Sequence, residues 1–216
     1  MLWRGKGGAV GLEFEDLPFY KRPDLTPYLI HLTRSTEAED DYSAFDNLVN
    51  ILNEGRIRGS TTKKGFIKGP SPATCLMDVP FVSLKYIVNS KSVGRKGPRY
   101  EPFGVFVTKK YAYDRGCRPV LYLSNSEMEE TLEIPEKEKW RVVTFEVSEK
   151  GWISWLHERE WRCKGDLVLP KNPYGVLVRS THDAQRLQRM IQKSPEKFKV
   201  KPRSILPLNV VCQGLP

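Results

Sequence analysis

Hydrophobic and polar positions alternate over residues 28–34, YLIHLTR, with the two-residue period of a β-strand. This alternation places His31 and Thr33 on one face of the strand, near the end at which it presents polar groups. The pattern predicts a strand that ends in side chains able to contact a ligand.

A helical spacing of apolar residues replaces this alternation from residue 43 to residue 53. Ser43 with Asp46 three residues later resembles a capping start, and Gly55 is a typical stop. We therefore expect one helix directly after the first strand.

Short runs rich in Val, Leu, Phe and Tyr make up most of the rest of the chain, which predicts small strands. An amphipathic helix over residues 183–192 interrupts them. Residues 1–27 are expected to be an irregular lead-in with a short element at 12–17, and 28–216 a single α+β domain. The expected strands cover residues 74–84, 103–108, 119–123, 140–147, 161–169, 175–179 and 205–211.

Two glycine-containing basic segments, residues 59–72 and 91–99, predict exposed loops, and both loops are expected to face one cleft. An acidic, lysine-containing tract, residues 127–139, predicts an exposed turn or helix. The loop cations Lys63, Lys64, Lys68, Arg95 and Lys96 have no helical spacing, so a groove-reading helix is not indicated.

The charge balance, 35 Lys and Arg against 26 Asp and Glu in 216 residues, gives a net charge of +9 and favours polyanionic partners. Charge alone does not choose between nucleic acid and phosphate-bearing small ligands. The four cysteines are scattered, with no paired spacing and no nearby histidine at zinc-ligand spacing, so free thiols are expected and no metal. The chain has no apolar run of membrane-spanning length and no signal-peptide pattern, so we expect a cytoplasmic protein without a membrane partner.

The densest cluster of chemically useful side chains is HEREWR, residues 157–162. In an extended segment Glu158, Glu160 and Arg162 would share one face, with Trp161 and His157 on the other. A carboxylate beside a guanidinium stays ionised, and such a carboxylate can bind a ribose hydroxyl or stabilise a cationic sugar in a transition state. The cluster therefore predicts a polar site of a kind that sugar-transfer chemistry can use.

Simpler interpretations of these residues remain open. His31 has apolar neighbours and suits a structural, hydrogen-bonded histidine. Glu158 and Glu160 suit surface ion pairs with Arg159 and Arg162, which add little stability. The three tryptophans Trp152, Trp155 and Trp161 are expected in the core.

The order of these motifs resembles the ADP-ribosyltransferases, and within them the DarT-type DNA-modifying toxins and the AbiGi-like abortive-infection proteins. Residues 28–34 resemble the first strand of the family, and NLVNILNEG, residues 47–55, resembles its following helix. Residues 75–84 are similar to the second core strand, 100–123 to a Gly-Val-Phe then Pro-Val-Leu-Tyr segment, and 160–162 to Glu-Trp-Arg. An acidic insertion, residues 37–41, departs from the pattern.

This resemblance implies an ADP-ribosyltransferase-like fold, a split pair of small, mostly antiparallel sheets with few helices. It implies NAD as the substrate, Glu160 as the catalytic carboxylate and Glu158 as the group that assists or orients the acceptor. The residues implied to bind NAD are His31, Thr33, Arg34 and Tyr100. It also implies a DNA or RNA acceptor, a toxin or phage-defence setting and a cognate antitoxin protein. No catalytic arginine is assigned.

Three alternatives stay open beside a transferase that acts on nucleic acid. In the first alternative, the enzyme transfers ADP-ribose to a protein, or to water in simple NAD hydrolysis. In the second, the same scaffold is a non-enzymatic antitoxin or sensor module. In the third, the chain is a basic nucleic-acid-binding domain. Changing Glu160 to Gln is expected to separate a transferase from a binding module, because the isosteric change removes a charge and hardly any packing.

Overall fold

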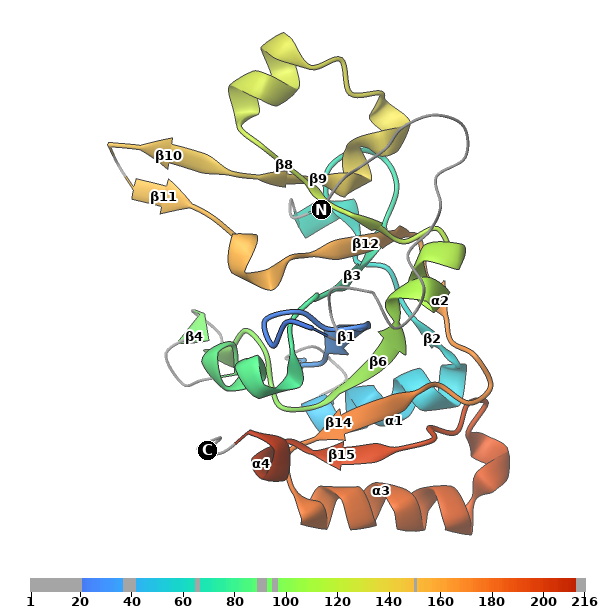
Figure 1. The fold of residues 1–216 in the computed structure, drawn as a ribbon. Helices are drawn as coiled ribbons and strands as arrows, with labels where there is room; N and C mark the ends of the chain where they lie inside the picture. The colour runs from blue at the N-terminus through green and yellow to red at the C-terminus, as the bar shows by residue number, and fades with distance from the viewer. Residues whose placement is uncertain are drawn as a thin grey trace.

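The computed structural model describes residues 21–36, 42–64, 67–88, 93–94, 97–149 and 151–212. The expected short element at 12–17 and the acidic insertion lie outside these residues. The fold is α+β, with few helices and several small sheets (Figure 1). The α-helices are α1 (Ala44–Glu54), α2 (Lys109–Asp114), α3 (Thr181–Lys193) and α4 (Leu208–Val211).

A four-stranded sheet in the order β1-β6-β14-β15 forms one half of the fold. Its strands are β1 (Tyr28–Leu32), β6 (Gly104–Thr108), β14 (Gly175–Val178) and β15 (Ile205–Pro207). The pairs β1–β6 and β6–β14 are antiparallel, and β14–β15 is parallel. His31 lies opposite Val105, so neighbouring strands fix its backbone on a sheet whose core positions are buried.

Two hydrophobic clusters lie on opposite faces of this sheet, as strand alternation requires. Leu29, Val105 and Val176 belong to the cluster that also contains apolar residues of α1 and α3. Ile30, Phe106 and Leu177 belong to the other cluster, which packs against the 3₁₀ helix η4 (Phe81–Tyr86) and α4. Burial on both faces explains why β6 and β14 are nearly continuous apolar runs.

The second sheet, in the order β3-β12-β7, is antiparallel and consists of β3 (Ala73–Leu76), β12 (Trp161–Lys164) and β7 (Arg118–Pro119). Directly after β3, Met77 forms an isolated antiparallel bridge with Ile30 of β1, through N–H···O bonds of 2.7 and 2.9 Å. One short segment thus pairs first with one sheet and then with the other. The predicted arrangement of small, mostly antiparallel sheets is confirmed.

The remaining strands form two-stranded ribbons, of which only β8–β9 is parallel among the described residues. They pair β13 with β2, β4 with β5, β8 with β9 and β10 with β11. Their bounds are β2 (Arg56–Ile57), β4 (Val93–Gly94), β5 (Gly97–Pro98), β8 (Leu121–Leu123), β9 (Val142–Thr144), β10 (Glu146–Ser148), β11 (Gly151–Ile153) and β13 (Leu167–Val168).

The cap signals of α1 are confirmed in detail. The Ser43 hydroxyl accepts from the Asp46 N–H, and the Asp46 carboxylate accepts from the Ser43 N–H, as in a capping box. Gly55 is left-handed, with φ 69°, and its N–H donates to the Ile51 carbonyl. Because these signals are local, the sequence alone could place this helix after β1.

Several expected strands are shorter than predicted. The run 74–84 stops as a strand at Leu76 and continues, after Pro80, as η4. The run 205–211 turns into α4 after Pro207, and the run 161–169 is divided at Gly165, which has φ 73°. The acidic tract contains a π-helical turn, Glu127–Thr131, and the 3₁₀ helix η7, Glu136–Arg141.

The expected place in the core is wrong for Trp152, whereas Trp155 is partly buried. Trp152 is 73% exposed on the hairpin β10–β11, which projects from the body of the protein in Figure 1, whereas Trp140 is buried. The hairpin pairs with no other sheet of the described chain, and its apolar residues Val147 and Ile153 are exposed as well. Trp161 packs partly buried against the main core.

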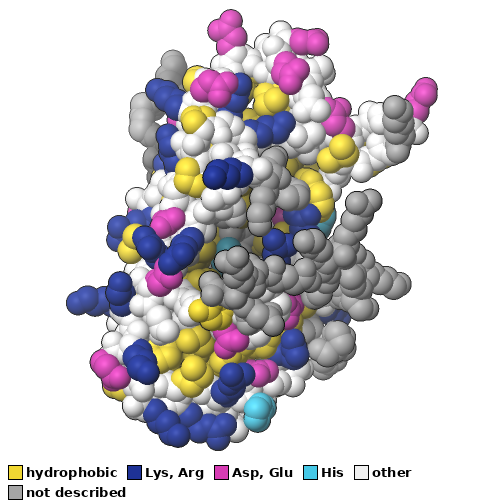
Figure 2. All heavy atoms as spheres, turned by 180° about the vertical axis from the view of Figure 1, so that it is seen from behind, with side chains coloured by type: hydrophobic (Ala, Val, Ile, Leu, Met, Phe, Trp, Pro, Cys, Tyr) yellow, Lys and Arg dark blue, Asp and Glu magenta, His cyan; other side chains and the backbone are white. Residues whose placement is uncertain are grey.

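Lysine and arginine side chains are spread over the face shown in Figure 2, with acidic side chains between them, and do not form one stripe. Arg95 and Lys96 lie outside the described residues, while Lys68 donates to the Asn125 side chain. The shared cleft between the two basic loops therefore stays a prediction. In the described part of the chain, no helix is long and apolar enough to cross a membrane.

Candidate active site

His31 is held at the junction of the two sheets. Its Nδ1 lies 2.9 Å from the Cys75 carbonyl oxygen, and a carbonyl can only accept, so Nδ1 carries the proton in this contact. Burial lowers the pKa of the imidazole. A neutral ring with Nδ1 protonated leaves Nε2 as an acceptor, which suits a hydroxyl donor such as that of a ribose.

Strand β6, which pairs with β1, requires a glycine where its backbone approaches His31. A Cβ on Gly104 of β6 would overlap the carbonyl oxygen of His31. Gly104 is thus required by the close approach of the two backbones, and it supports the candidate site indirectly.

The other two residues expected on this strand differ in their surroundings. Thr33 lies beyond the end of β1, 5% exposed, and its hydroxyl is 2.7 Å from the Ala44 carbonyl and 3.2 Å from that of Phe103. Its single proton is thus used to join β1 to the start of α1. Arg34 is exposed, and its carbonyl accepts from the Asn47 side chain. Their contact with NAD stays a prediction.

The segment that carries the two carboxylates is a turn, not the extended strand that the alternation predicted. Leu156–Glu158 is the 3₁₀ helix η8, and Arg159 follows in the left-handed region with φ 44° and ψ 52°. This turn separates Glu158 from the face that Glu160 shares with Arg162. The extended strand was predicted wrongly because alternation of residue types does not report the left-handed backbone conformation of Arg159.

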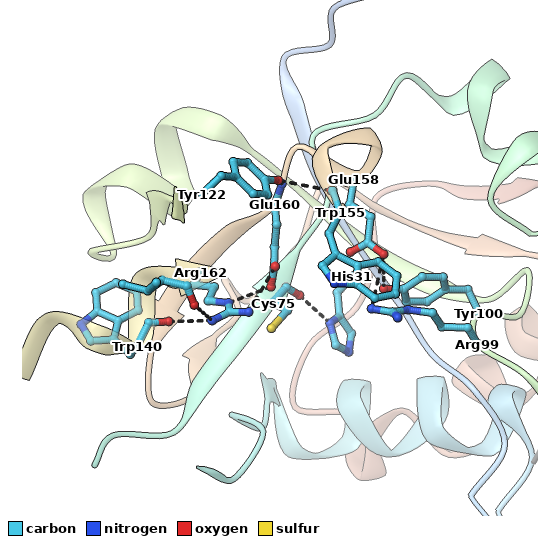
Figure 3. A network of polar contacts seen from close by, with 11 residues as sticks. His31, Cys75, Arg99, Tyr100, Tyr122, Trp140, Trp155, Glu158, Glu160 and Arg162 are labelled. Atoms are coloured by element: carbon cyan, nitrogen blue, oxygen red, sulfur yellow. Dashed lines mark hydrogen bonds and ion pairs between the residues drawn. The ribbon is translucent and has the colours of Figure 1, made fainter. Parts of the chain in front are cut away.

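Glu158 is 4% exposed and accepts a 2.9 Å hydrogen bond from the Tyr100 hydroxyl (Figure 3). Arg99 lies 3.5 Å and His157 4.0 Å from the same carboxylate oxygen, Oε1. Burial raises the pKa of Glu158, while Arg99 and Tyr100 oppose this shift. Burial also raises the pKa of Tyr100, which therefore remains a proton donor to the carboxylate.

Two expectations about this cluster are wrong. His157 does not point away from the carboxylates, because the 3₁₀ turn brings it beside Glu158. Glu158 does not pair with Arg159 at the surface. The Arg159 guanidinium instead donates to the carbonyls of Asp78 and Asp24, at 2.6 and 2.8 Å.

Glu160 forms a buried ion pair with Arg162, with Nε–Oε1 of 2.8 Å and Nη2–Oε2 of 3.3 Å. The two residues are 7% and 4% exposed, so the expected surface pair is in fact a core pair. Nη1 of Arg162 also donates to the Trp140 and Val142 carbonyls, at 2.9 and 3.1 Å. The pair therefore ties β12 to the segment that enters β9.

Cys75 of β3 connects the two halves of the site. Its carbonyl binds His31, and its side chain lies beside Glu160 and Arg162 in Figure 3. Burial raises the pKa of the thiol, so Cys75 is a packing residue rather than a thiolate nucleophile. His31 and Glu160, which are 129 positions apart in the sequence, thus contact the same residue.

Sequence reasoning missed Arg99 and Tyr122 as neighbours of the carboxylates. Arg99 lies 3.8 Å above the Trp155 ring, a cation–π geometry that places its charge beside Glu158. Tyr122 contacts the backbone of the turn. Arg99 was only one cation of an expected loop, and Tyr122 only one residue of an expected strand, so neither carried a specific signal.

Two hollows on the described surface lie away from these residues. One of about 310 Å³ is formed by residues 128–134 with Lys139. Another, of about 180 Å³, lies between the starts of α1 and α3 and includes Arg179 and Arg186. Neither includes His31, Glu158 or Glu160. Within the described chain, no three His, Cys, Asp or Glu side chains gather as metal ligands.

The raised pKa of Glu158 predicts a pH-dependent stability difference from a Glu158→Gln variant. Below the ordinary carboxyl range, about pH 4.3, this group is protonated in both folded and unfolded chains. As the pH rises through the raised folded pKa, the unfolded chain has already lost its proton and the folded state loses stability. The free energy of unfolding of wild type should therefore fall relative to the variant as the pH rises above about 4.3, the ordinary pKa of the carboxyl group.

Urea unfolding of both proteins over this pH series measures the difference. The groups that face Glu158 are Arg99, Tyr100, His157 and Glu160, and all are common to both proteins. If wild type instead gains stability over the variant as the pH rises, then Arg99, Tyr100 and His157 lower the pKa of Glu158 more than burial raises it.

A comparison with protein-family models finds no match, and a comparison with curated protein sequences finds none either. Solved structures of DarT from Thermus sp. 2.9 are similar in fold. The complex with ADP-ribosylated ssDNA has a TM-score of 0.46 at 10% identity, covering 84% of this chain and 93% of that chain. The complexes with NAD+ and carba-NAD+ have TM-scores of 0.45 and 0.44, each at 14% identity and covering 85% and 96%. This likeness concerns the course of the backbone and assigns no role to any residue of this chain.

Proposed function

We propose that this protein is an NAD-consuming ADP-ribosyltransferase that acts on nucleic acid. The observation that carries the proposal is the pair of buried carboxylates, Glu158 and Glu160, near the partly buried His31, whose lowered pKa favours the neutral ring. Buried ionisable groups in unlike environments are typical of sites that perform acid–base and charge-stabilising chemistry. The motif order of the sequence and its net charge of +9 support the same function.

In this reaction the bond between C1′ of the ribose and the nicotinamide nitrogen breaks, and nicotinamide leaves with the electron pair. Glu160 stabilises the positive charge that develops on the sugar, and Nε2 of His31 accepts from a ribose hydroxyl. Thr33, Arg34 and Tyr100 contribute contacts to NAD. A nucleophilic atom of the acceptor then bonds to C1′ and gives up a proton.

Glu158 is the group proposed to take that proton or to orient the acceptor. Its raised pKa brings it closer to the working pH, where a carboxylate is a better general base. Arg99 and Tyr100 hold its Oε1 in one orientation.

Incubation of the purified protein with NAD labelled in the adenylate phosphate tests the function. Single-stranded DNA, duplex DNA, RNA and no acceptor form parallel reactions. We expect free nicotinamide, together with label on a nucleic acid. Label on protein alone would mean a different acceptor, and free ADP-ribose alone would mean NAD hydrolysis. If no reaction releases nicotinamide, the enzyme assignment is wrong.

A non-enzymatic antitoxin or sensor module on the same scaffold is a second candidate, which one specific observation favours. Arg162 occupies both oxygens of Glu160, as expected of a structural ion pair. Such a module would bind NAD, measured by calorimetry, and release no nicotinamide. Binding without turnover in the reactions above would select it.

A further inference from the structure

Tyr122 of β8 contacts both ends of the turn that carries the two carboxylates. Its hydroxyl oxygen accepts from the Glu160 N–H at 3.1 Å and donates to the Trp155 carbonyl at 3.3 Å. A single hydroxyl group thus closes the loop from residue 155 to residue 160. Figure 3 shows the ring beside Glu160, with its hydroxyl toward the backbone of the turn.

The turn itself has an unfavourable backbone conformation. Arg159, between the two carboxylates, is the non-glycine residue with positive φ in the described chain. A residue with a Cβ is uncommon in this region and persists only where the surroundings hold it. Here the Arg159 guanidinium is bound to the carbonyls of Asp78 and Asp24, and Tyr122 holds the turn from the other side.

The contacts within the turn do not by themselves keep its two ends together. The N–H groups of Glu158 and Arg159 donate to the Trp155 and Leu156 carbonyls, which forms the 3₁₀ helix. The N–H of Glu160, one residue later, has Tyr122 as its acceptor. The Val120 N–H donates to the Glu160 carbonyl at 3.0 Å, so the direction in which Glu160 leaves the turn depends on that bond together with a hydroxyl from a different ribbon, β8–β9.

We propose that Tyr122 is a positioning residue for the transferase, which holds the turn of residues 155–160 in the conformation that presents Glu158 and Glu160 to the substrate. This inference rests on the proposed function. Tyr122 itself contacts only backbone atoms of the turn in these two bonds, so it acts through the carboxylates. Loss of its hydroxyl should change the geometry of the reacting groups more than the binding of NAD.

The variant Tyr122→Phe removes one oxygen atom and keeps the ring. Tyr111→Phe is the matched control, because the Tyr111 hydroxyl also donates to a carbonyl, that of Val168, at 2.9 Å and away from the turn. We expect Tyr122→Phe to lower kcat for nicotinamide release by about 10-fold to 100-fold, since small displacements of reacting groups have effects of this size. KM for NAD should stay within about twofold, whereas Tyr111→Phe should match wild type.

Amide hydrogen exchange of the peptide covering residues 155–160 gives a second readout that needs no activity. We expect faster exchange in Tyr122→Phe and wild-type exchange in Tyr111→Phe. Equal exchange in both variants would overturn the role of Tyr122 in holding the turn. Faster exchange with an unchanged kcat would overturn its role in the reaction. A wild type that releases no nicotinamide would contradict the proposed function, and exchange would still decide whether Tyr122 holds the turn.

Discussion

Replacement of Glu158 by Gln is expected to slow nicotinamide release or transfer to the acceptor by about 100-fold or more, the usual effect of removing an acid–base or charge-stabilising group. The amide keeps the shape of the side chain and can still contact the Tyr100 hydroxyl, but it cannot take a proton at neutral pH. Since burial disfavours the charged carboxylate, the variant should be no less stable than wild type near neutrality. Rates under saturating NAD, with melting temperature measured in parallel, check this result.

Glu196→Gln is the matched control for charge. Glu196 lies exposed in the 3₁₀ helix Pro195–Lys197, so its replacement changes the net charge equally and leaves the site untouched. The control should retain wild-type rates. If Glu158→Gln also retains them, Glu158 takes no part in the chemistry and Glu160 alone remains as the acidic group of the site.

Arg162→Met is expected to lower the free energy of unfolding by about 3–5 kcal/mol, because it leaves the Glu160 carboxylate buried without its partner. The Trp140 and Val142 carbonyls also lose their donor. Glu160→Gln should cost a comparable amount, since it removes the carboxylate that balances the buried charge of Arg162. The sequence alone predicted that Glu160→Gln leaves the fold intact, whereas the buried pair predicts a loss of stability, so the activity of this variant must be measured on protein shown to be folded.

The double variant Glu160→Gln with Arg162→Met should recover part of the loss, because neither charge is then left alone in the core. Arg58→Met breaks the exposed pair with Glu54 and should cost less than about 1 kcal/mol. Urea unfolding of the four proteins and wild type gives the comparison. Additive single losses would mean that the two charges do not stabilise each other.

Local signals of the sequence determined the frame of the fold. The strand β1, the capped helix α1, the core strands β6 and β14 and the helix α3 all appear where periodicity and cap chemistry predicted them. These elements depend on contacts between residues a few positions apart, or on a simple division into buried and exposed faces. The same signals placed His31 at the end of a strand and the carboxylates near the start of another.

Only the tertiary structure decided how these groups meet. Tyr100 reaches Glu158 over 58 positions, and His31 reaches the Cys75 carbonyl over 44. No period in the sequence encodes such pairs, because they depend on how the segment after β3 joins the two sheets through the bridge between Met77 and Ile30. The left-handed conformation of Arg159 could not be predicted from the sequence either, since the carbonyls that hold its side chain are distant in the sequence. Sequence thus determined which groups are present and tertiary packing decided which are buried together, because burial and hydrogen bonding of polar groups are properties of their surroundings.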